Sequence, residues 1–135
     1  MNINEFKKEW ISDGISETTV DYAEKFGKYL CDIQPDNRLG RMAMTTAQIR
    51  NVFGEVKRIQ AKGYNEEKAS FLLLRPKIAY AEARVKAKSG RSRIEDFRKV
   101  IEMAHLAVKE EKHFQNFVDF FEAVLAYHKA AGGRD

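Results

Sequence analysis

The sequence lacks the features of a disulfide-stabilised or membrane-spanning protein. It contains one cysteine, Cys31, which excludes an internal disulfide and fits a reducing compartment. Runs of aliphatic or aromatic residues such as Phe71–Leu74 are far shorter than a membrane span requires. The N-terminus carries Glu5, Lys7 and Lys8 where a signal peptide would have an apolar core. We therefore expect a cytoplasmic protein with no membrane partner.

The motifs of the common enzyme classes are also missing. No Gly-x-Ser-x-Gly, phosphate-cradling glycine-rich loop or Cys-x-x-Cys occurs. Cys31 follows an aromatic stripe and has no cationic cluster beside it, so we expect a small buried hydrophobic residue rather than a nucleophile. The sequence predicts no catalytic residue, no cofactor and no enzymatic activity.

A metal site is disfavoured for a different reason. Glu102 with His105, and Glu110 with His113, each have the Glu-x-x-His spacing of di-iron helical bundles. Such sites need the two motifs on facing helices and two further inward glutamates, whereas these motifs lie in one continuous stretch. His128 lies near an apolar stripe and is expected to be a core or boundary histidine. We predict no metal site.

What the sequence does contain is the composition of a globular protein. Of its 135 residues 44% are hydrophobic and 33% are charged, which is not a disordered composition. A chain of this length buries about two thirds of its unfolded surface and folds without a metal or disulfide. We predict one domain over residues 1–135.

Apolar spacings of three and four residues recur along the whole chain, and no alternating strand pattern is found. We expect helices over residues 2–11, 16–33, 45–63, 65–88 and 94–125, with Trp10 packed as an anchor. The segment over residues 65–88 contains Pro76, so a kink or break is expected at Leu74–Arg75. The last segment loses its phase at residues 109–113 and forms two helices or one bent helix. The fold class is all-α, a compact bundle of five to six helices with mostly antiparallel neighbours.

The stretch from Thr45 to Gly63 has a complete set of helix signals. Thr45 and Gln48 have the spacing of a capping box, and Gly63 is a natural C-terminal stop. Its apolar residues cover about a 120° arc at 100° per residue. Arg50 and Lys57 flank that arc on one side, while Arg58 and Lys62 lie opposite it. This leaves a cationic surface that the core does not need.

Charge is concentrated in the middle of the chain. The net charge is −4 over residues 1–37, +10 over residues 38–100 and −2 over residues 101–135, which makes +4 in total. Cations on several helices bind a phosphate backbone without reading bases. Asn51 is a candidate for reading a base, although a weak one, and we expect the rings of Tyr64 and Tyr80 to pack rather than stack on bases. Sequence-independent binding of RNA or DNA is the function that these residues favour.

Two blocks of this basic region resemble a known family. "MTTAQIRNVFGEVKRIQ" followed by "FLLLRPKIAYAEAR" is similar to the small subunit of the type III-A CRISPR effector, the Csm complex. The blocks cover Thr45 to about Arg84, roughly a third of the chain. The chain departs from the family pattern at Glu82, where a smaller residue is expected.

The resemblance implies a non-catalytic helical bundle in an antiviral RNA-guided complex. Its implied partners are the target RNA and guide RNA, the backbone and large subunits, and other copies of itself. Carried onto this sequence, the basic positions of the two blocks predict RNA contact by Arg50, Lys57, Arg58, Lys77 and Arg84. Charge position alone adds Arg41, Lys62, Arg75, Lys86, Arg91 and Arg93. The alternative is a helical adaptor or structural protein whose basic face docks an acidic protein partner.

Overall fold

Five helices of 13 to 20 residues form most of the structure. The computed structural model describes residues 1–135, and its only β pairing is one isolated bridge between Ile33 and Leu39. The long helices are α2 (Glu17–Leu30), α3 (Thr46–Lys62), α5 (Leu74–Ser89), α6 (Ile94–Leu106) and α7 (Glu111–Ala130). Three short elements complete the chain, the 3-10 turn η1 (Ile3–Glu5), α1 (Glu9–Ser12) and α4 (Lys68–Leu72). The predicted all-α bundle is confirmed, and residues 94–130 form two helices.

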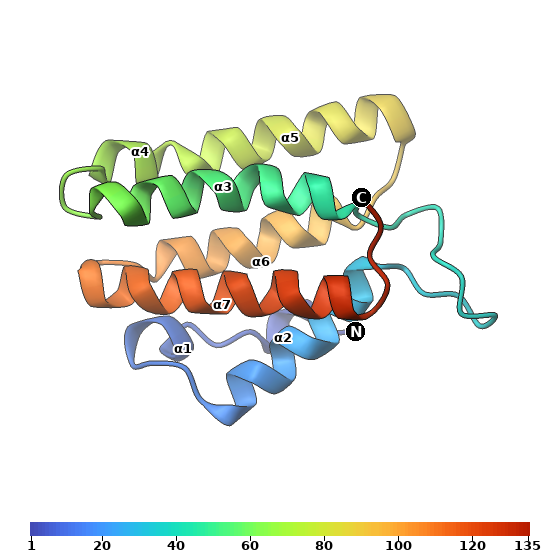
Figure 1. Ribbon diagram of the computed structural model, residues 1–135, viewed down its shortest axis with the longest axis horizontal. Helices are drawn as coiled ribbons and strands as arrows, with labels where there is room; N and C mark the ends of the chain where they lie inside the picture. Colours follow the sequence, from blue (N-terminus) through green and yellow to red (C-terminus); the bar gives the residue numbers. More distant parts are fainter.

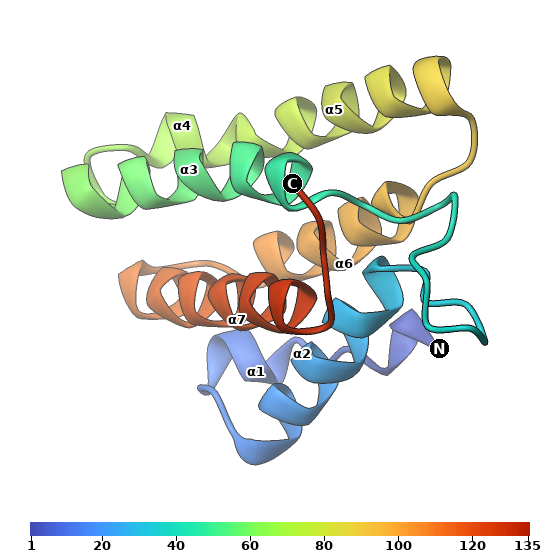
Figure 2. The ribbon, with the colours of Figure 1, turned by 45° about the vertical axis from the view of Figure 1, so that its right-hand side comes forward.

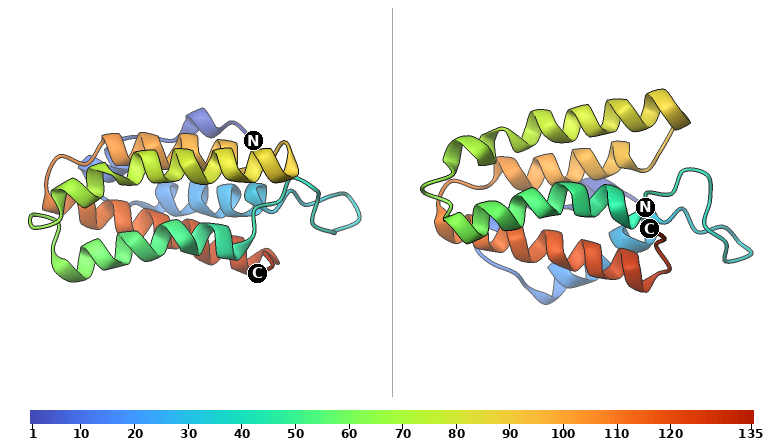
Figure 3. Two further views of the ribbon diagram at one scale, coloured as in Figure 1. Left: turned by 90° about the horizontal axis from the view of Figure 1, so that it is seen from above. Right: turned by 45° about the horizontal axis from the view of Figure 1, so that its top comes forward.

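The helices lie in layers, and most neighbours are antiparallel, but α2 runs in the same direction as α7, since Tyr22 lies against Phe120 and Cys31 against His128. Helices α3 and α5 form one layer, α6 and α7 lie beneath it, and α1 and α2 cover the opposite side (Figures 1 and 2). Seen from above, α4 joins α3 to α5 at one end, and the loop between α2 and α3 projects beyond the other end (Figure 3). The basic helices α3 and α5 therefore lie on the side of the molecule away from the acidic N-terminal segment.

Helix α7 is the centre of the core because apolar residues cover most of its circumference. On one side Phe120 packs against Tyr22 of α2, with 6.2 Å between ring centroids. On the other side Phe121 packs against Phe53 of α3 at 5.0 Å and Phe97 of α6 at 5.6 Å. All five rings belong to one cluster of 29 buried residues. Truncating a ring such as Phe121 to alanine would cost about 3–5 kcal/mol.

Helix α3 begins and ends at the residues that the sequence predicts. The Gln48 amide donates to Thr45 Oγ1 at 3.1 Å, and the Thr45 amide donates to Gln48 Oε1 at 3.0 Å. The capping box thus satisfies two amides that the helix leaves unpaired. At the other end Gly63 has φ +109°, a conformation that favours glycine. Because both ends of α3 are fixed, the positions of its cationic residues around the helix are fixed as well.

The predicted break near Pro76 is confirmed one residue earlier than expected. Helix α4 ends at Leu72, Leu73 lies between the two helices, and α5 begins at Leu74. Pro76 has no amide to donate to the Leu72 carbonyl, so the chain cannot continue as one helix. In the first turn of α5 that missing donor has no intrahelical partner to lose. The break lets α5 lie along α3.

Two expected helix boundaries are wrong. Residues 2–11 form η1 and α1 rather than one helix, because the Ile3 carbonyl accepts from Phe6 at 3.3 Å and from the Tyr22 hydroxyl at 2.8 Å. Asn65 does not cap a helix, since its side-chain amide donates to Glu111 Oε2 at 3.0 Å. Residues 64–67 form a turn instead, and helix resumes at Lys68.

His128 ties the C-terminal end of α7 to the start of α3. It is fully buried, and its Nε2 donates to the Met44 carbonyl at 2.8 Å. The tail beyond α7 returns to the same place, where the Thr46 amide donates to the Arg134 carbonyl at 2.7 Å. Cys31 is also buried there, with its thiol 3.4 Å from the His128 carbonyl, and burial raises its pKa. Burial lowers the pKa of His128, so the histidine is neutral at pH 7.

Candidate nucleic-acid interface

A groove of about 520 Å³ runs between α3 and α5. Leu74 and Ile78 are the only fully buried residues of α5, which shows that this helix contacts the bundle along a narrow stripe. Its polar flank therefore stays open beside α3. The lining comprises Asn51, Val52 and Glu55 from α3 and Leu74, Pro76, Lys77, Tyr80, Ala81 and Arg84 from α5. Two of the predicted RNA-binding residues, Lys77 and Arg84, thus face one concave surface.

Glu55 organises the cations at the centre of this groove. Its carboxylate accepts from Arg58 Nη2 at 2.8 Å and lies 3.6 Å from Lys77 Nζ. Arg58 also pairs with Glu67 at 3.3 Å. The hydrogen bond from Arg58, together with the charge of Lys77, lowers the pKa of Glu55 below its usual range. Arg58 and Lys77 are held in place, but part of their charge is already neutralised.

Arg84 carries the free charge of the groove. It is exposed and forms no ion pair, and its guanidinium lies 5.9 Å from the centroid of the Tyr80 ring. Lys62 near the end of α3 is also exposed and without an ion pair. A cation without a neighbouring carboxylate keeps its full affinity for phosphate, whereas a paired one must give up its partner first.

Arg50 and Lys57 lie on the other flank of α3, the one that faces α7. This placement follows from their neighbours, since Gln60 of α3 donates to Gln115 of α7 at 3.1 Å. Arg50 lies 3.9 Å from the Asp135 carboxylate, and Lys57 has no carboxylate partner but lies 5.9 Å from the ring of Phe53. The structure therefore divides the five residues of the two blocks between two flanks of the α3–α5 layer.

The residues added from charge position lie outside the groove. Arg93 points inward, where its guanidinium pairs with Asp32 at 2.9 Å and lies 4.2 Å from the ring of Tyr29. Lys86 pairs with Glu82 and Glu95 at 3.7 and 3.6 Å. Of the others, Arg75 lines a small apolar crevice beside α6, and Arg41 and Arg91 are exposed near the ends of loops.

The two tyrosines of the basic region differ from each other. Tyr64 is buried against Phe114, with ring centroids 5.2 Å apart, as expected. The expectation that Tyr80 packs is wrong, because 66% of its surface is exposed. Helical spacing placed Tyr80 on a helix but could not reveal that this flank of α5 has no neighbour. Glu55 is a second residue that sequence reasoning missed, because its partner Lys77 lies on another helix.

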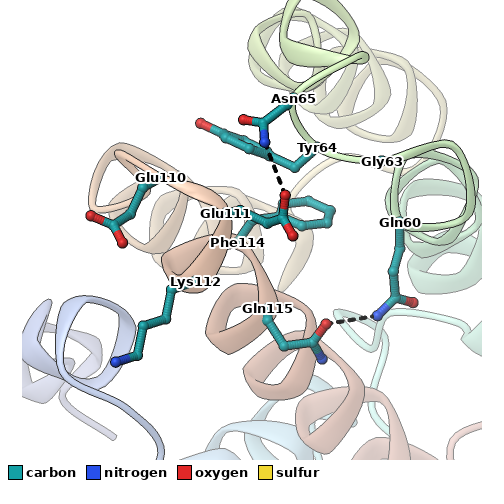
Figure 4. A pocket seen from close by; sticks show the side chains of 9 residues that line it. All are labelled: Gln60, Gly63, Tyr64, Asn65, Glu110, Glu111, Lys112, Phe114 and Gln115. Carbon is teal, nitrogen blue, oxygen red and sulfur yellow. Dashed lines mark hydrogen bonds between the residues drawn. The ribbon is translucent and has the colours of Figure 1, made fainter.

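The remaining hollows and histidines show no catalytic arrangement. The largest hollow, about 690 Å³ beside the start of α7, is lined by hydrogen-bonded polar pairs such as Gln60 with Gln115 (Figure 4). His105 is buried, stacks on Phe71 at 3.9 Å and donates from Nε2 to the Phe71 carbonyl at 2.6 Å. Burial lowers its pKa. No group of three or more His, Cys, Asp or Glu side chains is placed to hold a metal ion.

The helices are too short or too polar to cross a membrane.

Comparison with known proteins adds independent information. Neither the curated proteins nor the solved structures contain a match to this chain. Residues 15–134, nearly the whole chain, match the family model described as Csm2 Type III-A. That range includes every element that forms the α3–α5 groove and the helices beneath it. The chain therefore belongs to the Csm2 family, the small subunits of type III-A CRISPR effector complexes.

Proposed function

We propose that this protein is a non-catalytic subunit that holds RNA through the α3–α5 layer within the type III-A effector. The groove supplies Lys77 and Arg84, and Arg58 extends it along α3. These side chains bind phosphates and leave the bases to pair with the guide strand. The target RNA and the guide RNA are the nucleic acids in reach of such a surface.

One observation carries the proposal. Lys77 and Arg84 come from one helix, face the same groove and are both exposed, with Arg84 free of any carboxylate. Each phosphate contact of this kind contributes about 1 kcal/mol in moderate salt. Lys62, one turn after Arg58, adds unpaired charge on the same flank of α3, whereas Lys57 lies on the opposite flank. The remaining candidates, Arg41, Arg50, Arg75, Lys86, Arg91 and Arg93, contribute at the margins or through the fold.

The other implied partners need other surfaces. The polar hollow at the start of α7 and the faces of α1 and α2 lie away from the groove. These surfaces are available to the backbone and large subunits and to further copies of this chain. We assign no catalytic step to the protein, and cleavage chemistry would belong to other subunits.

Charge reversal tests the proposal. The variant carrying Lys77→Glu and Arg84→Glu should bind a fluorescent single-stranded RNA at least tenfold more weakly, because two phosphate contacts become repulsions. The matched control carries Lys7→Glu and Lys25→Glu, the same charge change on the α1–α2 side. Fluorescence anisotropy measures both affinities, and circular dichroism checks folding. Equal losses in the two variants would contradict a localised interface.

The same variants address the adaptor alternative. An adaptor that docks an acidic protein would bind no RNA at any salt concentration. Its charge-reversed variant would instead lose a protein partner from the assembled complex, which pull-down with the other subunits would reveal. Absence of RNA binding together with loss of a protein partner would contradict the RNA proposal and support the adaptor function.

A further inference from the structure

Tyr80 is unusual among the aromatic residues of this protein. The chain has nine Phe, five Tyr and one Trp, and every one of them except Tyr80 is buried or half-buried. The Tyr80 hydroxyl makes no hydrogen bond within the chain, and its ring packs on no other ring. A ring that packs on no other ring and is 66% exposed is available to a ligand.

The neighbours of Tyr80 are those that a stacked nucleotide needs. Lys77 precedes it by one turn and Arg84 follows it by one turn, and all three line the same groove. At 1.5 Å per residue the two cations are about 10 Å apart along the helix axis, with the ring between them. Phosphates on both sides of one base can therefore be held while that base lies on the ring.

Across the groove, α3 completes the site. Asn51 is exposed and lines the same groove, so its amide is free to donate to or accept from the edge of a base. Arg84, 5.9 Å from the Tyr80 centroid, covers part of the ring by a cation–π contact that leaves the ring mostly accessible. A base stacked on the open part of the ring would extend this contact.

We infer that the α3–α5 groove binds an unpaired nucleotide, with its base stacked on Tyr80 and its flanking phosphates on Lys77 and Arg84. The inference rests on the proposed function and narrows its substrate to a strand that has at least one base outside a duplex. Bases inside a duplex have no free face for the ring, whereas any unpaired base has one. Because every base has such a face, recognition by Tyr80 is independent of sequence.

Binding of a short oligoadenylate tests this inference. Tyr80→Ala should weaken binding of the single strand about tenfold, within the range of one base–aromatic stack. Tyr80→Phe should keep the wild-type affinity, because the ring and not the hydroxyl stacks. The matched control is Leu106→Ala, which removes a similarly exposed apolar side chain, 48% exposed, at the end of α6.

Two further ligands separate stacking from phosphate contact. An abasic strand of the same length and a fully paired duplex keep the phosphates but offer no free base, so wild type and Tyr80→Ala should bind each of them equally. Loss of affinity in Lys77→Glu with Arg84→Glu, but none in Tyr80→Ala, would overturn the stacking inference and leave the proposed function intact. Failure of the wild type to bind any of these strands at low salt would overturn both.

Discussion

Removing a negative charge from the centre of the groove should tighten RNA binding. Glu55 lies 3.6 Å from Lys77 Nζ, so a phosphate oxygen that contacts Lys77 at about 3 Å lies within about 6.5 Å of the Glu55 carboxylate. Coulomb's law in water gives a repulsion of about 0.6 kcal/mol at that distance. Replacing Glu55 with glutamine, which also frees Lys77 and Arg58, should therefore increase the affinity about threefold.

The assay is fluorescence anisotropy with a single-stranded RNA at low ionic strength. Screening by salt should shrink the gain, because the Debye length falls from about 30 Å at 0.01 M to about 10 Å at 0.1 M. Glu24→Gln is the matched control, since Glu24 pairs with Lys28 at 3.7 Å on α2, outside the proposed interface. An unchanged or weaker affinity for Glu55→Gln, or an equal gain for Glu24→Gln, would refute the reasoning.

Three further predictions concern the fold. Gly27→Ala should lower the free energy of unfolding in urea by about 2 kcal/mol, because its Cβ would lie 2.7 Å from the α7 backbone. Arg93→Met should cost about 2 kcal/mol by leaving Asp32 unpaired, yet RNA affinity should be unchanged, and a selective loss of RNA binding would contradict this structural role. Burial lowers the pKa of His105 and His128 below about 6.5, so the unfolded chain binds more protons in acid than the folded chain does. The free energy of unfolding should therefore decrease as pH falls below that value, by at most about 1.4 kcal/mol per pH unit for each histidine. Thermal unfolding between pH 7 and pH 5 measures this loss, and His128→Gln should reduce it.

Local sequence rules predict the helices well because they act over a few residues. The capping box of Thr45 and Gln48, the stop at Gly63 and the break before Pro76 each depend on backbone groups within one turn. The prediction of one helix in the N-terminal segment is wrong because it depends on a contact with a distant residue. Its Ile3 carbonyl is taken by Tyr22, nineteen residues away, and no local pattern reveals that partner.

The candidate site depends on which helices become neighbours, so less of it follows from the sequence. The blocks identify Lys77 and Arg84 as basic positions, but their groove exists only because α5 touches α3 along a narrow stripe. The pairing of Glu55 with Lys77 and the exposure of Tyr80 arise from that same contact. Periodicity shows which face of a helix is apolar, and it does not show which polar flank remains uncovered.

The salt dependence of RNA affinity tests the central claim most directly. For a single strand the logarithm of the binding constant should fall linearly with the logarithm of salt concentration, with a slope of about −0.7 for each phosphate neutralised. Contacts from Arg58, Lys77 and Arg84 predict a slope near −2, and replacing Lys77 and Arg84 with glutamine should make it less steep by about 1.4. A flat salt response in the wild type, or the same slope in the double variant, would contradict RNA binding through the α3–α5 groove.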